Sequence, residues 1–247
     1  MKIIASYSNK GGVGKTASAV NISHCLAQSG QKVLLCDLDP QGASSFYFRV
    51  KPSKKLESKG FFKKSDRFTD AIRGSDFDNL DILPANMNFR DFDVFLSRMK
   101  RSQSRLEKVL RSVRAEYDVV VLDCPPNIST LSENIFHSAD AVVVPVIPTT
   151  LSERTFEQLI DFFREHGLER KKILAFFSMA QGTKKLHGET IKRMRREHAK
   201  RFLDVTVPAS TDVEKMGIHR APVATFAASH DAARAYAQLA GEIMKKL

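Results

Sequence analysis

Short apolar runs alternate with amphipathic stretches along most of the chain. The apolar runs are rich in Val, Ile and Leu, which is typical of buried parallel strands. These predicted strands cover residues 3–7, 32–36, 80–83, 117–122, 141–146, 172–177 and 203–207. Apolar residues at helical spacing between them predict amphipathic helices. The predicted helices cover residues 14–29, 91–100, 103–114, 152–166, 188–202, 211–217 and 230–246.

This order of elements predicts the fold class. Strands that alternate with helices are joined by right-handed crossovers and form a mostly parallel, doubly wound sheet. We therefore expect an α/β protein in which helices flank a parallel sheet. The 247 residues, of which 43% are hydrophobic, suit one large core, so we expect a single domain over residues 1–247.

A glycine-rich segment, Asn-Lys-Gly-Gly-Val-Gly-Lys-Thr, occupies residues 9–16 between the first strand and the first helix. Glycines let the backbone curl so that its N–H groups and the helix N-terminus face phosphate oxygens. In such a loop Lys15 reaches the β- and γ-phosphates and the Thr16 hydroxyl binds Mg²⁺ directly. A glycine-rich turn without a ligand is the alternative, which the strand and helix on either side disfavour.

The segment departs from the generic G-x-x-x-x-G-K-[ST] motif. Asn9 replaces the first glycine, and Lys10 adds a second lysine. The sequence Lys-Gly-Gly-Val-Gly-Lys-Thr resembles the deviant Walker A loop of the ParA/MinD family of P-loop ATPases, and the resemblance extends over nearly the whole chain. It implies the cofactors ATP and Mg²⁺, and an ATP-sandwich homodimer in which Lys10 reaches the partner's phosphates. The implied ATP-binding residues in the loop are Lys10, Gly11, Gly12, Val13, Gly14, Lys15, Thr16 and Ala17.

Carboxylates follow two of the predicted strands, at the edge where an α/β sheet binds its ligand. Asp37 and Asp39 lie in the segment Asp-Leu-Asp-Pro-Gln-Gly, and Asp123 begins an Asp-x-Pro-Pro segment that resembles the Walker B motif of the ParA family. The resemblance implies that Asp39 positions the attacking water and that Asp39 and Asp123 bind Mg²⁺ through water. Asp37 is expected to support the loop. Helix capping or turn closure is the alternative role. The predicted catalytic residues are Lys10, Lys15, Asp39 and Asp123.

The adenine site is less readable. By resemblance, residues 205–208 lie beside the base, so Pro208 is expected to contribute to ATP binding. The residues themselves show only a strand that ends at a proline.

The chain is strongly basic, with a formal net charge of +11. Such a charge favours a polyanionic partner, although a merely soluble basic protein is the alternative. Basic residues concentrate between 184 and 201, where a predicted helix turns most of them outward; a solvated helix face would look the same. The ParA family binds DNA without sequence preference, which implies contacts with double-stranded DNA. The candidate DNA-binding residues are Lys192, Arg193, Arg195, Arg196, Lys200, Arg201 and Arg220.

Other features bear on location and on the least regular segment. Residues 47–67 are rich in lysine and predict a mobile surface loop, with a contact surface for DNA or a partner as the alternative. Three cysteines without a C-x-x-C pair, no signal peptide and no long apolar stretch predict a cytoplasmic protein without a membrane partner. The ATP state is expected to be nucleoid-associated. Because the first strand begins at Lys2, we expect no helix-turn-helix extension.

Together these features favour a slow ATPase whose ATP-bound dimer binds DNA and is released when an adaptor protein stimulates hydrolysis. Its cargo is a plasmid, a chromosome origin, a microcompartment or a protein array. A MinD-like membrane regulator is one alternative, disfavoured because residues 235–247 lack a bulky apolar face. A metabolic P-loop enzyme is the other; a nitrogenase-type reductase needs cluster-binding cysteines that we do not find.

Overall fold

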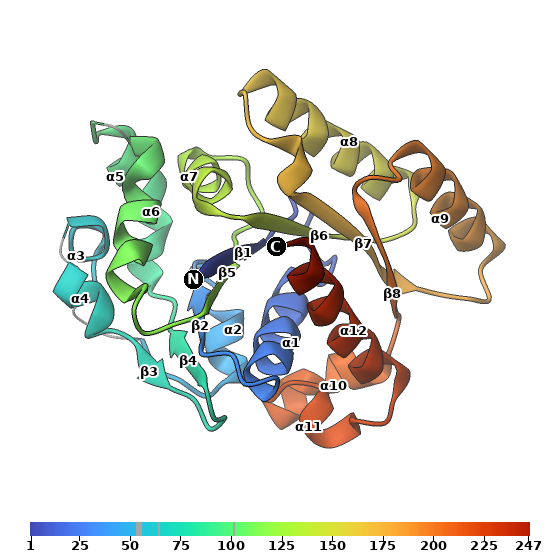
Figure 1. Ribbon diagram of the computed structural model, residues 1–247, viewed down its shortest axis with the longest axis horizontal. Helices are drawn as coiled ribbons and strands as arrows, with labels where there is room; N and C mark the ends of the chain where they lie inside the picture. Colours follow the sequence, from blue (N-terminus) through green and yellow to red (C-terminus); the bar gives the residue numbers. More distant parts are fainter. Residues whose placement is uncertain (53–55, 64, 101) are drawn as a thin grey trace.

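The computed structural model describes residues 1–52, 56–63, 65–100 and 102–247. Within these residues one sheet has the strand order β3-β4-β2-β5-β1-β6-β7-β8 (Figure 1). Neighbouring strands are parallel except for the pair of β3 and β4 at one edge. The strands are β1 (Lys2–Ser6), β2 (Val33–Asp37), β3 (Arg73–Gly74), β4 (Leu80–Leu83), β5 (Val119–Asp123), β6 (Ala141–Val146), β7 (Ile173–Ala180) and β8 (Phe202–Pro208). The predicted α/β fold with a mostly parallel sheet is confirmed.

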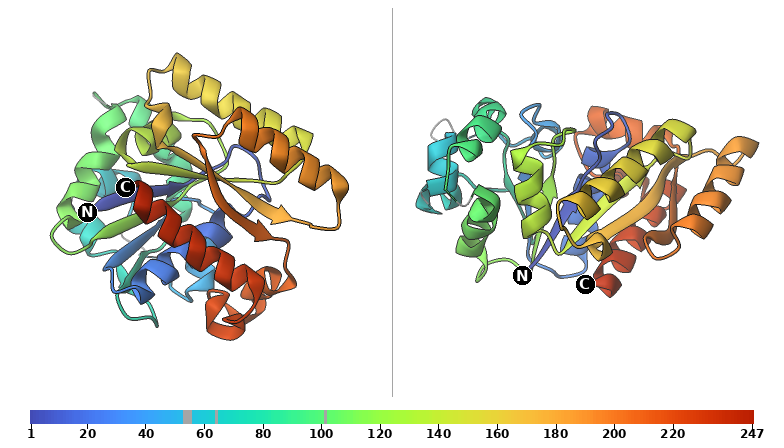
Figure 2. Two further views of the ribbon diagram at one scale, coloured as in Figure 1. Left: turned by 45° about the vertical axis from the view of Figure 1, so that its right-hand side comes forward. Right: turned by 90° about the horizontal axis from the view of Figure 1, so that it is seen from above.

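Helices cover both faces of the sheet (Figures 1 and 2). The face covered by α1 and α12 carries α1 (Lys15–Gln28), α2 (Ala43–Tyr47), α10 (Thr211–His219), α11 (Ala224–Ala227) and α12 (Asp231–Lys246). The other face carries α3 (Ser58–Lys63), α4 (Ser65–Thr69), α5 (Phe92–Ser97), α6 (Arg105–Leu110), α7 (Thr130–Ser138), α8 (Thr150–Glu165) and α9 (Lys185–Glu197). Short 3₁₀ helices are η1 (Met87–Asp91), η2 (Ser102–Ser104), η3 (Arg111–Val113) and η4 (Arg170–Lys172).

The sheet separates two hydrophobic cores. Successive side chains of a strand point to opposite faces, so one strand contributes side chains to both cores. In β1, Ile3 and Ala5 join the core beneath α7 and α8, whereas Ile4 joins the core beneath α1 and α12. Every residue of β2 and β5 is buried. Burial on both faces explains why these strands are continuous apolar runs that the sequence reveals without alternation.

The prediction of a mobile surface loop over residues 47–67 is wrong for the part that forms α3 and α4, whereas residues 49–52 do form an irregular segment. Leu56 and Phe61 are buried, and the ring of Phe61 lies 4.8 Å from that of Phe92, measured between centroids. Phe62 and Phe68 extend this aromatic cluster. The helices α3 and α4 are too short to show a helical period. The many lysines near the phenylalanines also make the segment polar on average, so its contribution to the hydrophobic core is not evident from the sequence. Lys54, Lys55 and Lys64 lie outside the described residues.

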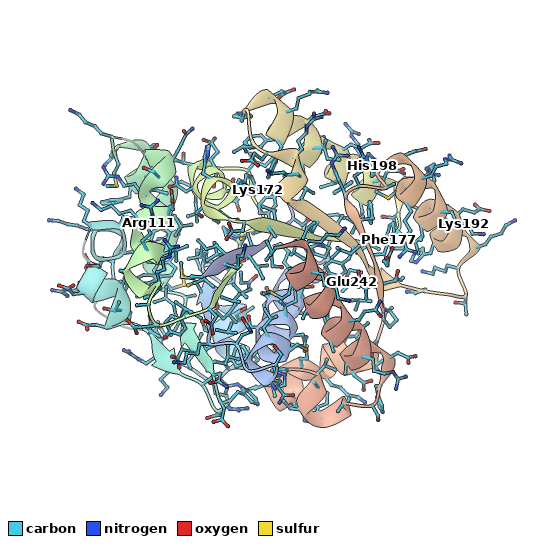
Figure 3. The ribbon with its side chains drawn as sticks, viewed as in Figure 1. Arg111, Lys172, Phe177, Lys192, His198 and Glu242 are labelled. Atoms are coloured by element: carbon cyan, nitrogen blue, oxygen red, sulfur yellow. The ribbon has the colours of Figure 1, made fainter. Side chains whose placement is uncertain are left out.

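The basic helix also differs from its prediction. We expected a helix over 188–202, but α9 spans Lys185–Glu197 and Phe202 begins β8. There the Phe202 ring stacks on Phe177 of β7, with 4.5 Å between ring centroids. Figure 3 shows Phe177 on this part of the sheet, with Lys192 on α9 at the edge of the molecule. Apolar residues at helical spacing continue beyond the end of α9 to the first residue of β8, and this is why the sequence placed the end of the helix too late. The helices α2, α7 and α11 and the two-residue strand β3 were not predicted.

Candidate nucleotide-binding site

The residues predicted to bind the nucleotide converge because their strands are neighbours. In the sheet β1 lies beside β5, and β5 lies beside β2. The register pairs Ser6 with Asp123 and Asp37 with Asp123. The carboxyl ends of these three parallel strands therefore lie side by side. The glycine-rich loop follows the first of them and Asp39 follows the second, so residues far apart in sequence meet at one edge.

The glycine-rich loop has the backbone of an anion site. Gly12 and Gly14 have φ values of 70° and 95°, in the left-handed region that side chains rarely adopt. A Cβ atom on Gly14 would stand 3.0 Å from the Ser178 hydroxyl. Helix α1 begins at Lys15. No side chain among the described residues caps its N-terminus, and its first turn contains no acidic residue. The N–H groups of that turn are therefore left for an anion.

The two lysines of the loop have different surroundings. Lys15 is only 9% exposed, and burial lowers the pKa of its ammonium, an effect that Asp123 and Asp39 oppose. Lys10 is half-buried at the rim, where its Nζ donates a hydrogen bond of 3.0 Å to the Ser152 hydroxyl at the start of α8. The charge of Lys15 thus interacts with the carboxylates of the site, whereas Lys10 contacts the first turn of α8.

Asp123 is fully buried, and its two carboxylate oxygens differ in their hydrogen bonding. Its Oδ2 accepts a hydrogen bond of 2.7 Å from the Ser44 hydroxyl, while Oδ1 has no partner in the described residues. Burial raises the pKa of this carboxyl to about 6, and the hydrogen bonds from Ser44 and Thr16 act against that rise. An unpartnered buried carboxylate oxygen beside the Thr16 hydroxyl fits a hydrated Mg²⁺ ion. Since the described residues form no cluster of three metal-binding side chains, the ion would need phosphate oxygens as well.

Asp39 lies just beyond β2 and is partly open to solvent. Its Oδ1 accepts a hydrogen bond of 3.0 Å from the Gln41 N–H, and its charge acts on both Lys15 and Asp123. A carboxylate near the phosphate loop and accessible to water is suited to hold a water molecule. The bond from Gln41 also closes the turn, so this side chain has the structural role that we gave as its alternative.

Asp37 supports the segment that follows. Its Oδ2 accepts hydrogen bonds from both the N–H and the hydroxyl of Ser45, at 2.8 and 2.7 Å. These bonds fasten the first turn of α2 to the end of β2. Burial, with a contribution from the Asp123 carboxylate, raises the pKa of Asp37 to about 8.

A cavity of about 180 Å³ adjoins the loop at Gly14. Its lining includes Pro208 at the end of β8, which the sequence singled out, together with Met179 and Tyr236. The last two were missed. Tyr236 belongs to the alanine-rich terminal helix, and Met179 has a φ of 53° at the end of β7, a conformation with no signal in the sequence. An aromatic ring and aliphatic side chains beside a phosphate loop suit a planar base.

Comparison with known proteins identifies the family. A family model described as an AAA domain matches residues 1–176. One full-length relative is the sporulation initiation inhibitor protein Soj of Bacillus subtilis, which is 27% identical with 98% of each chain covered. Another is the chromosome partitioning protein ParA of Caulobacter vibrioides, which is 27% identical over 100% of this chain and 95% of the relative. The chain belongs to the ParA/Soj family of ATPases.

Solved structures agree on the fold of this ParA/Soj family member. The McdA–ATP complex from Cyanothece has a TM-score of 0.84 at 18% identity and covers 99% of this chain and 96% of its own. Cobyrinic acid a,c-diamide synthase from Mycobacterium smegmatis, with a bound ATP analog and magnesium, has a TM-score of 0.82 at 22% identity, covering 99% and 95%. At these identities the likeness extends to the fold alone. Within the described residues, no helix has the length and apolar character needed to cross a bilayer.

The basic residues of this ParA/Soj protein fall into two groups. Lys192, Arg196 and Lys200 are exposed on α9 and the turn after it, and we call these three the α9 cationic face. Other candidates use their guanidinium groups within the protein. Arg193 donates to Glu153 of α8 at 3.0 Å, and Arg195 donates to Thr206 of β8 at 3.2 Å. The sequence could not reveal these partners, because they come from elements that are neighbours only in space.

The remaining two candidates differ in position. Arg201 is half-buried just before β8. Arg220 ends α10 on the other face of the sheet, where its guanidinium lies over the Phe46 ring at 4.5 Å. The structure therefore does not gather all seven candidate residues into one patch.

The buried carboxyl of Asp37 makes stability depend on pH. With a folded pKa of about 8 against an ordinary value of 3.8, the folded protein keeps a proton that the unfolded chain loses between these values. Stability therefore falls as pH rises towards 8. Asp37→Asn keeps an acceptor for Ser45 without the charge. We expect it to stabilise the nucleotide-free protein by about 1–2 kcal/mol at pH 8, and by less at pH 5.5.

Denaturant unfolding at the two pH values measures this effect. The control is Asp78→Asn, which removes an exposed carboxylate and should change stability little at either pH. Equal effects of Asp37→Asn at pH 5.5 and pH 8 would argue against the raised pKa.

Proposed function

We propose that this protein is a ParA-type ATPase that segregates or positions a cargo in the cytoplasm. ATP and Mg²⁺ join two copies into a sandwich dimer, the dimer binds double-stranded DNA without sequence preference and is nucleoid-associated, and an adaptor protein stimulates hydrolysis to release it. The observation that carries the proposal is the position of Lys10 at the rim of a site that already holds Lys15, Asp39 and Asp123. The relatives named for chromosome partitioning support it.

Hydrolysis needs positioning and charge neutralisation rather than covalent work by the protein. Lys15 neutralises the β- and γ-phosphate oxygens. Thr16 would bind Mg²⁺ directly and Asp123 through water, and the ion would supply further positive charge at the phosphates. Asp39 accepts a hydrogen bond from a water molecule and orients it for attack on the γ-phosphorus. The basal rate is slow, and the adaptor raises it.

Lys10 is the residue that makes the site depend on a partner. Its own chain already provides Lys15 for the phosphates, and its ammonium lies instead at the rim against Ser152. The bond to the neutral Ser152 hydroxyl is easily exchanged for a stronger bond to a charged phosphate oxygen. In the dimer Lys10 takes that bond with the nucleotide of the partner, which links subunit pairing to the presence of the γ-phosphate.

DNA binding follows from paired cationic surfaces. Phosphate contacts confer affinity without sequence preference, and their strength falls steeply with salt. The α9 cationic face of one subunit carries three cations that form no ion pair with a second element in the part of the chain that the structure describes. Two copies in one dimer double the number of phosphate contacts, so the dimer binds where a monomer does not.

The test of this proposal is DNA binding measured with ATP, with ADP and without nucleotide over a salt series. We expect tight binding only with ATP, weakened by orders of magnitude between 50 and 200 mM salt. Binding that is the same in all three nucleotide conditions would contradict the proposal.

The contribution of the α9 cationic face is tested by the triple variant Lys192→Ala, Arg196→Ala, Lys200→Ala. We expect DNA affinity in the ATP state to fall by at least about tenfold and the slope of log K against log salt to shrink by about 3, because three phosphate contacts are lost. The control is Arg98→Ala, Lys108→Ala, Arg114→Ala, which removes three exposed cations from the α5–α6 region. Equal losses in both variants would mean that net charge, rather than this face, governs binding.

A further inference from the structure

The short helix α2 lies between the nucleotide site and one of the candidate DNA-binding arginines. It follows the Asp39 turn, and Gly42, with a φ of 67°, precedes its first residue. Three consecutive residues of this helix, Ser44, Ser45 and Phe46, contact different parts of the protein. None of these contacts has a role in the function proposed above.

The inner side of α2 is fastened to the site carboxylates. The Ser44 hydroxyl donates to Asp123 at 2.7 Å, and the Ser45 hydroxyl donates to Asp37 at 2.7 Å. The Ser45 hydroxyl also accepts a hydrogen bond of 2.8 Å from the N–H of Ala85. Both serines are buried, so these bonds are shielded from water and resist exchange.

The outer side of α2 holds Arg220. The Phe46 side chain is 49% exposed, and the Arg220 guanidinium carbon lies 4.5 Å from the centre of its ring. The Phe46 carbonyl accepts a hydrogen bond of 3.1 Å from the Nε of Arg220. The Arg220 backbone has a φ of 49°, and its carbonyl accepts a bond of 2.7 Å from Arg49.

These contacts leave part of the guanidinium for another partner. Its Nε is used by Phe46, whereas its two Nη groups make no hydrogen bond to any described residue. A planar guanidinium that is stacked on a ring and held at Nε presents its Nη groups in a fixed direction. Such a fork matches the geometry of a phosphate group and loses little side-chain entropy on binding.

We infer that α2 is a positioning element for Arg220, which it orients towards DNA phosphates according to the state of the nucleotide site. Phe46 is the positioning residue: it fixes the guanidinium with both Nη groups free. Because the Ser44 hydroxyl joins α2 to Asp123, a nucleotide whose metal ion binds at Asp123 sets the position of α2 and therefore of Arg220. The inference rests on the proposed function, since it requires DNA binding in the ATP state.

The path from Asp123 through α2 to Phe46 is short. An α-helix rises about 1.5 Å per residue, so Ser44 and Phe46 are about 3 Å apart along the axis. Asp123 has a free oxygen as well as the one that Ser44 uses, so a hydrated metal ion changes the hydrogen bonding at the inner end of α2 directly. A displacement there is transmitted to Phe46 within a single turn of helix.

The first test is a double-mutant cycle of Phe46→Ala and Arg220→Ala, with duplex DNA and a non-hydrolysable ATP analogue. We expect Arg220→Ala to weaken DNA binding about five- to tenfold, Phe46→Ala to weaken it nearly as much, and the double variant to be no weaker than Arg220→Ala. Phe46→Tyr keeps the ring and should retain wild-type affinity. The matched control is Ile218→Ala, which truncates a side chain that is 80% exposed on the same helix end as Arg220.

The second test measures the link to the nucleotide site. Ser44→Ala should lower the ratio of DNA affinities with the ATP analogue and with ADP at least threefold, with nucleotide binding measured separately. Additive losses in the cycle, or wild-type affinity in Phe46→Ala, would overturn the inference while the proposed function stands. Absence of ATP-dependent DNA binding in the wild type would overturn both. Thermal unfolding of each variant separates these outcomes from loss of the fold.

Discussion

Replacement of Asp39 by alanine is expected to abolish ATP turnover while ATP remains bound. The carboxylate lies beyond β2, partly open to water and close enough to Lys15 to affect its charge, and among the described residues its one hydrogen-bond donor is the N–H of Gln41. Loss of a residue that orients the attacking water costs about 10²–10⁴-fold in rate. Within the described residues the Asp39 side chain forms no hydrogen bond with the phosphate loop, so nucleotide affinity should change little. Single-turnover hydrolysis and equilibrium nucleotide binding measure the two effects separately.

Two comparisons make this result specific to Asp39. Asp78→Ala removes an exposed carboxylate far along the chain and should leave turnover unchanged. Asp39→Ala should also accumulate the ATP-bound dimer on DNA, because release requires hydrolysis. Hydrolysis near the wild-type rate in Asp39→Ala would show that another group positions the water.

The second large effect is expected from the two lysines of the phosphate loop, which should fail at different steps. Lys15→Ala removes a nearly buried ammonium from the β- and γ-phosphates, at a cost of about 1.5–3 kcal/mol, and nucleotide capture should weaken by roughly 10- to 150-fold. Lys10→Ala removes a contact that we assign to the partner's nucleotide. Its nucleotide capture should stay near wild type, whereas the ATP-dependent dimer, DNA binding and turnover should be lost.

Nucleotide titration and light scattering with an ATP analogue separate these steps. The fold should tolerate Lys10→Ala, because within the described residues the only hydrogen bond of this side chain goes to the Ser152 hydroxyl. A variant Ser152→Ala serves as the control for that bond and should still dimerise. If Lys10→Ala dimerised normally with ATP, the assignment of this lysine to the partner's phosphates would be wrong.

The sequence revealed those parts of the fold in which local pattern and tertiary position agree. The central strands are buried on both faces, so their apolar runs are continuous, and the glycine-rich loop is a local motif with a defined place after β1. Because parallel strands end at the same edge, Asp123 could be placed near the loop from the sequence. The structure adds the register that pairs it with Asp37.

Other features depend on contacts that no local pattern encodes. Helices α3 and α4 are five or six residues long, and Phe61 is buried there by partners such as Phe92 from a distant segment. Arg193 and Arg195 resembled free surface cations in the sequence, but their partners Glu153 and Thr206 come from neighbouring elements. For the same reason, charge counting along the sequence does not separate free cations from those that have partners within the protein.

The edges of the sheet restrict how two copies of the chain associate. At one edge, the Glu242 carboxylate of α12 accepts hydrogen bonds from the N–H groups of Asp204 and Val205 in β8, at 2.9 and 3.3 Å, and Arg195 binds the carbonyl of Asp204 (Figure 3 shows Glu242). At the other edge, β3 has only two residues. Side chains thus occupy backbone groups that a strand from another molecule would need. Continuous sheets between subunits are thereby disfavoured, so the dimer that we propose would have to form through other surfaces.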